Sequence, residues 1–167
     1  MSDIRMRVWR VGRRSDSRYL LILRDDWGSP LVMVIGPCEA AAIWSAMREN
    51  SARLSQDPEG PGAEGALARI PAAHDLIDAM LTRLGGKLEK VVIDDLWNGT
   101  YYAKLHLAVD GQRLTVDGRP SDCVALALRA RAPLYVTEEV LDASREDDSP
   151  SGSEPESGDP LAGLEDL

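Results

Sequence analysis

The chain has 167 residues, of which 44% are hydrophobic, enough for one ordinary core and too few for two comfortable domains. No run of about 18 apolar residues is present to span a membrane, and residues 1–14 lack the apolar region of a secretory signal, so we expect a cytoplasmic protein. The net charge of -9 lies mostly in residues 144–167, which hold eight acids against one arginine and leave the rest almost neutral.

The first half of the chain predicts three strands followed by a helix. Residues 37–47 are typical of a helix with Pro37 at its first position. Residues 51–68 contain three glycines and two prolines, which predicts a long surface loop. The β-rich runs that predict the strands are residues 6–11, 19–24 and 31–35.

The second half repeats this alternation in a different order. A helix with an apolar stripe is expected first, and Gly85-Gly86 is expected to end it. Asn98-Gly99 and Asp110-Gly111 are the residues that type I′ turns require, so the strands that follow predict an antiparallel meander. A last helix at residues 120–131 begins with Pro120. The stripe consists of Leu76, Ile77, Met80, Leu81 and Leu84, and the strands are residues 87–96, 101–109 and 113–117.

Charge divides the chain into a predicted domain, residues 1–143, and a predicted disordered acidic tail, residues 144–167. Residues 147–159 have no apolar side chain that could offset the entropy of ordering. By contrast, residues 1–24 hold seven arginines against two aspartates, which could face phosphates or be solvated on an edge strand. The tail is therefore either a solubilising appendage or a polyanion mimic that competes with nucleic acid for these arginines.

An internal repeat appears when the sequence is aligned with itself at an offset of 83 residues. Tyr19 then matches Tyr102, Pro37 matches Pro120, and an acid follows at the third helical position in each half. The alternative is chance similarity between two amphipathic patterns. We predict an α+β fold with a mixed, largely antiparallel sheet and three main helices, built from a duplicated ββα unit.

The polar residues at the start of the last helix are the densest candidate site. The N–H groups of a helix N-terminus favour a phosphate, which Arg119 and Ser121 would also bind. Asp117 and Asp122 could hold a divalent cation, Mg²⁺ or Mn²⁺. In the alternative, Asp122 only complements the helix dipole and Arg119 pairs with a nearby carboxylate.

Two further groups of polar residues are candidates. His74 could act as a general base or a metal ligand, and its neighbour Asp75 is a second catalytic candidate that could equally stabilise the first turn of its helix. Glu39 and Asp94 are secondary candidates, although Asp94 and Asp95 point to opposite faces of a strand unless a bulge intervenes. Walker, Gly-x-Gly-x-x-Gly, Gly-x-Ser-x-Gly and His-Glu-x-x-His motifs are absent from the sequence.

The two cysteines are too few for a disulfide framework. Neither Cys38 nor Cys123 lies in a Cys-x-x-Cys pair that could hold zinc or perform redox chemistry. We predict that both are buried thiols. His106 lies opposite two leucines of its strand, so we assign it no function.

Several segments, together with the gaps between them, form a recognisable set. They are Gly36-Pro37-Cys38-Glu39, His74-Asp75-Leu76, Asn98-Gly99-Thr100-Tyr101-Tyr102, Asp117-Gly118-Arg119-Pro120-Ser121-Asp122-Cys123, and Pro133-Leu134-Tyr135-Val136. This set resembles the bifunctional nuclease domain over about residues 5–142. Ala73 departs from the threonine that commonly precedes His-Asp there, and Gly118 and Cys123 stand where alanine is usual.

The resemblance implies hydrolysis of phosphodiester bonds in RNA and DNA, with nucleic acid as the partner. Within that activity we assign metal binding to Asp117 and Asp122, phosphate binding to Arg119, and activation of water to His74. The alternative is a non-enzymatic module that binds a nucleotide or a protein, which the lack of a strong basic patch favours. Exposed strand edges and four tryptophans also predict a homo-oligomer, most simply a dimer.

Overall fold

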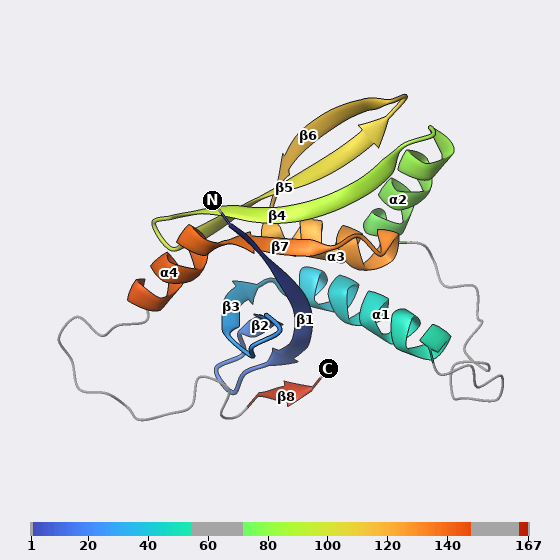
Figure 1. The fold of residues 1–167 in the computed structure, drawn as a ribbon. Coiled ribbons are helices and arrows are strands. Elements are labelled where there is room, and N and C mark those ends of the chain that lie inside the picture. Colours follow the sequence, from blue (N-terminus) through green and yellow to red (C-terminus); the bar gives the residue numbers. More distant parts are fainter. Residues whose placement is uncertain (1, 55–71, 148–163, 167) are drawn as a thin grey trace.

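The computed structural model describes residues 2–54, 72–147 and 164–166. Seven strands form one sheet in the order β3-β2-β1-β7-β4-β5-β6, and a short eighth strand, β8, pairs with β1 (Figure 1). The strands are β1 (Asp3–Arg13), β2 (Tyr19–Arg24), β3 (Pro30–Ile35), β4 (Lys87–Trp97), β5 (Thr100–Val109), β6 (Gln112–Gly118), β7 (Leu134–Thr137) and β8 (Glu165–Asp166).

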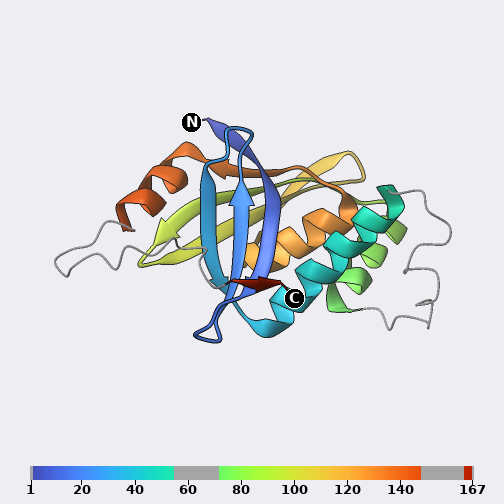
Figure 2. The same ribbon diagram turned by 90° about the horizontal axis from the view of Figure 1, so that it is seen from below.

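Strand β1 joins two parts of the sheet. Its first residues, 3–6, pair with β7, and residues 7–13 pair with β2 after the strand has bent. Because β1 bends, the meander β1-β2-β3 lies below the meander β4-β5-β6 in Figure 1 and runs across it (Figures 1 and 2). Only the β4–β7 pair is parallel among the strands described. The predicted mixed, largely antiparallel sheet is thus confirmed.

The described residues contain four helices, so the prediction of three main helices is wrong. The helix that the sequence did not reveal is α4, which is short and mostly polar and in which Val140 and Leu141 are deeply buried. Helix α1 also continues to Leu54, beyond the predicted end at residue 47. The helices are α1 (Pro37–Leu54), α2 (Ala73–Arg83), α3 (Pro120–Ala130) and α4 (Glu138–Asp147).

The predicted turns of the second meander are confirmed. Asn98 and Gly99 have φ of 49° and 71°, and Asp110 and Gly111 have φ of 50° and 75°, as a type I′ turn requires at both central residues. Each half of the chain therefore contains a hairpin followed by a helix that begins with proline. The duplication of one ββα unit stays a prediction.

The core lies between the sheet and the helices, and α3 contributes more buried apolar residues to it than any other described element. Cys123 to Ala127 are all buried, and burial raises the pKa of Cys123 to about 12, with the charge of Asp122 adding to the rise. Cys38 is exposed, so the prediction that it is buried is wrong. It lies in the first turn of α1, where Ala40 and Ile43 point to the core instead. No described helix is long and apolar enough to cross a bilayer.

The C-terminal residues 164–166 lie beside the arginine-rich β1. Gly12 and Arg13 pair with Asp166 and Glu165, and Arg10 donates to the backbone oxygen of Leu164 (3.1 Å). Helix α4 continues to Asp147, beyond the predicted domain end at residue 143. The rest of the predicted tail and loop falls on residues 55–71 and 148–163, outside the described residues. Competition between the tail and nucleic acid stays a prediction.

Candidate functional site

Four polar side chains at the starts of three helices form a chain of contacts, which we call the polar network. Asp122, in the first turn of α3, lies with Oδ1 3.0 Å from His74 Nε2 of α2. Its other oxygen, Oδ2, accepts from Arg119 Nε at 2.7 Å. Arg119 Nη1 in turn lies 2.9 Å from Oε1 of Glu39, in the first turn of α1. The structure therefore brings together His74, Arg119, Asp122 and Glu39.

Glycine at position 118 lets β6 end close to α3. A Cβ added to Gly118 would lie 2.7 Å from Cys123 Sγ, closer than such atoms approach in folded proteins. The thiol of Cys123 therefore fits here because Gly118 has no side chain. This packing fixes where Arg119 and the first turn of α3 emerge from the sheet.

The network determines the charge state of its central carboxylate. Burial raises the pKa of Asp122, but hydrogen bonds from Arg119 and His74 outweigh burial and hold that pKa below its usual value. The hydrogen bond to Asp122 likewise raises the pKa of Arg119. Since an ionised carboxylate can only accept, His74 Nε2 donates to it, and in the neutral ring Nδ1 then carries the free lone pair.

Exposure differs along the network. The side chains of His74 and Glu39 are each 15% exposed, whereas that of Arg119 is 67% exposed. Arg119 is therefore held by two carboxylates and still open to solvent. Such a guanidinium can meet an anionic ligand with little reorganisation.

A groove of about 780 Å³ adjoins the network. Glu39, Arg119 and Ser121 lie in its wall, while His74 and Asp122 do not line it. Two further arginines, Arg14 and Arg145, also line it, together with Thr100 and Tyr101 of the β4–β5 hairpin. Arginines beside an aromatic ring and a hydroxyl suit a nucleic-acid backbone with its bases.

Asp75 lies next to His74 but its carboxylate is engaged elsewhere. Oδ2 accepts from the N–H of Ala72 (2.8 Å), and Oδ1 accepts from Arg129 Nε (2.7 Å). Arg129 is only 4% exposed and also donates to the backbone oxygens of Ala42 and Ala125. These contacts tie α2 to α3 and α1, so Asp75 and Arg129 set the position of His74.

Asp117 and Asp94 belong to a different cluster. Asp94, on β4 beside a register shift, forms an ion pair with Lys104 of β5, which raises the pKa of Lys104. Asp117 lies opposite Lys104 on β6, and its charge adds to that rise. The contacts of Asp117 and Asp122 therefore have no residue in common.

The candidate metal ligands do not form a ready site. Within residues 2–54, 72–147 and 164–166, no three His, Cys, Asp or Glu side chains are close enough together to hold a metal ion. Both oxygens of Asp122 already accept hydrogen bonds from protein groups. The side chains described therefore offer no preformed site of three ligands, and the binding of Mg²⁺ or Mn²⁺ by Asp117 and Asp122 stays a prediction.

The family model described as the bifunctional nuclease domain matches residues 62–149, which include His74, Arg119 and Asp122. The chain belongs to the bifunctional nuclease domain family. An uncharacterized protein of Mycobacterium tuberculosis (strain H37Rv) is 36% identical over 141 residues, which cover 84% of this chain and 74% of that protein. Bifunctional nuclease 1 of Oryza sativa subsp. japonica is 24% identical over 137 residues, 80% of this chain but 37% of the rice protein.

In this member of the bifunctional nuclease family, sequence reasoning missed Arg129 and the groove residues Arg14, Arg145 and Tyr101. Arg129 follows Asp122 by seven residues and so lies on the same face of α3, a spacing that could have revealed it. The groove residues come from segments far apart in the chain. No local pattern could have united them.

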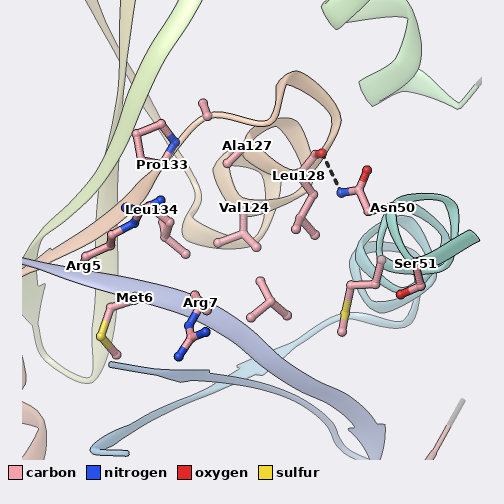
Figure 3. A pocket seen from close by; sticks show the side chains of 13 residues that line it. Arg5, Met6, Arg7, Asn50, Ser51, Val124, Ala127, Leu128, Pro133 and Leu134 are labelled. Carbon is pink, nitrogen blue, oxygen red and sulfur yellow. Dashed lines mark hydrogen bonds between the residues drawn. The ribbon is translucent and has the colours of Figure 1, made fainter. Parts of the chain in front are cut away.

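A second cavity, of about 310 Å³, lies between β1, α1, α3 and the start of β7 (Figure 3). Apolar side chains such as Val124 and Leu134 line much of this cavity. Asn50 also lines it and donates a hydrogen bond to the backbone oxygen of Leu128 (3.0 Å). The cavity contains no member of the polar network. We therefore place the candidate nuclease site at the polar network, where it adjoins the groove, and not at this cavity.

Proposed function

We propose that this chain is a nuclease that hydrolyses phosphodiester bonds in RNA and DNA, in the cytoplasm. The observation that carries the proposal is the His74–Asp122–Arg119 chain of contacts, in which an oriented imidazole is linked to an exposed guanidinium. An imidazole can take a proton near neutral pH, and a guanidinium can neutralise a phosphate. Phosphodiester hydrolysis requires both proton transfer and neutralisation of the phosphate charge.

In the proposed reaction, water adds to phosphorus, one P–O ester bond breaks, and the leaving oxygen takes a proton from solvent to become a hydroxyl. His74 Nδ1 accepts the proton of the attacking water, while Asp122 holds the ring through Nε2 and stabilises the imidazolium that forms. Arg119 stabilises the charge that builds up on the phosphoryl oxygens, and Glu39 holds Arg119 in place. Ser121 and the first N–H groups of α3 supply further donors for the phosphate.

A divalent cation remains a separate proposal, because the described side chains do not offer three converging ligands. When bound, such a cation would polarise the phosphoryl oxygens, and Asp117 and Asp122 stay the acids proposed to hold it. The roles of His74 and Arg119 do not depend on it.

The experiment is cleavage of single-stranded RNA and single-stranded DNA by the purified full chain, with Mg²⁺ or Mn²⁺ and with EDTA. We expect shortened products from both polymers, and loss of cleavage in EDTA that returns when metal is restored. Cleavage that persists in EDTA would contradict the proposed cation but not the proposed nuclease activity. RNA and DNA that stay intact under every metal condition would contradict the proposed nuclease activity.

The second candidate is a non-enzymatic module that binds a nucleotide or a protein. It is favoured by the same network, because each member is already paired with another and none needs a substrate for its hydrogen bonds. The two candidates differ in one result. A binding module retains its oligonucleotide ligand intact, whereas the nuclease releases products.

A further inference from the structure

Six large apolar side chains are exposed on two elements of the second half, helix α2 and strand β6. Helix α2 has no buried residue, although its sequence carries an apolar stripe. The exposed fractions run from 45% at Val116 to 70% at Leu84. The six are Leu76, Ile77, Met80 and Leu84 of α2 and Leu114 and Val116 of β6. A cluster of this kind on a monomer usually marks a surface that another molecule covers.

The two elements lie on the same side of the sheet. Val116 pairs with Leu105 and Leu114 pairs with Leu107, so each pair points to the same face. Those two leucines of β5 pack against the core, as Leu81 of α2 does. Leu114 and Val116 therefore point to the core-facing side of β5, against which α3 packs, and α2 packs against α3.

Strand β6 is also a free edge. Among the described strands it pairs with β5 alone and ends the sheet. Its sequence, Gln-Arg-Leu-Thr-Val-Asp-Gly, contains no proline that would remove a backbone donor. The opposite edge, β3, begins with Pro30 and so is less suited to pairing.

The sequence of β6 complements itself. If two copies pair antiparallel about a two-fold axis at Thr115, Leu114 lies opposite Val116 and Arg113 lies opposite Asp117. Both apolar pairs then face the helix side, and both charge pairs face the other side. Arg113 also forms an exposed ion pair with Glu89 (3.4 Å), which leaves further guanidinium donors for the copy.

We propose that a second copy of this chain binds at β6, by antiparallel β6–β6 pairing that continues the sheet and covers the apolar side chains of β6 and α2. The charge complementarity of Arg113 and Asp117 fixes the register. The binding partner is a second copy and not another protein, because in this pairing the apolar and the charged residues of one β6 lie opposite complementary residues of the other β6. No member of the polar network takes part in this dimer. Asp117, which is also proposed to hold the cation, is tested here by molar mass and not by cleavage.

The test is the molar mass of the full chain by light scattering, at tens of micromolar. The wild type is expected at twice its chain mass of 18.2 kDa. Val116→Lys places a charge in the apolar seam of both copies and is expected to raise the dissociation constant at least about tenfold. The matched control is Val34→Lys on β3, where the side chain is 62% exposed, and it should remain a dimer.

A charge exchange tests the register itself. Arg113→Glu and Asp117→Arg each place like charges opposite one another and should each weaken the dimer, whereas the double variant should restore it. Circular dichroism of each variant excludes unfolding. A monomeric wild type, a dimer that survives Val116→Lys, or a double variant no tighter than the single variants would overturn the proposal.

Discussion

Replacing His74 with alanine is expected to lower the rate of RNA and DNA cleavage by about 100-fold or more. His74 supplies the imidazole of the polar network, and Asp122 orients its ring through Nε2, which leaves Nδ1 to accept the proton of water. Arg119 and Glu39 remain in place without it, so substrate binding should change much less than the rate. The measurement is single-turnover cleavage of a labelled single-stranded oligonucleotide at saturating protein.

His106→Ala is the matched control for that experiment. His106 is the other histidine of the chain and lies on β5, opposite Thr115 and outside the polar network. Its variant should cleave at the wild-type rate. A His74→Ala protein that is folded and cleaves as fast as His106→Ala would remove His74 from the chemistry.

The largest loss of stability is expected at Arg129. Arg129→Met keeps the apolar stem but removes the charge that pairs with Asp75 and the donors that bind Ala42 and Ala125. Because Arg129 is 4% exposed and Asp75 only 25% exposed, we expect the free energy of unfolding to fall by about 2–4 kcal/mol. Urea unfolding followed by circular dichroism measures it.

Arg119→Met is the matched control for stability. Arg119 is also paired with carboxylates but is 67% exposed, so its loss should cost much less stability than the loss of Arg129. It should still impair cleavage. Equal losses of stability in the two variants would contradict the distinction between a positioning arginine and a phosphate-binding one.

The parts of the fold that depend on local rules could be predicted from the sequence. The type I′ turns follow from Asn98-Gly99 and Asp110-Gly111, where positive φ is needed at both residues. The start of α3 follows from Pro120, and the contact between Arg119 and Asp122 spans only three residues. In each case the residues that decide the structure are neighbours in the chain.

The features that depend on distant contacts could not be predicted in this way. Asp122 meets His74 across 48 residues, and the residue types that made each of them a candidate could not show that they meet. Asp117 precedes Asp122 by five residues and was paired with it, yet β6 directs it toward Lys104. Burial of Cys38 was inferred from residue type alone, whereas the packing of α1 exposes it.

The most direct test of the proposed site is the cleavage rate of Asp122→Asn relative to the wild type, on single-stranded RNA and DNA, with the fold of both checked. The amide keeps the shape of the carboxylate but removes the charge that orients His74 and holds Arg119. We predict a loss of about 100-fold or more on both polymers with the fold intact. Equal rates from two folded proteins would contradict the assignment of the polar network as the nuclease site.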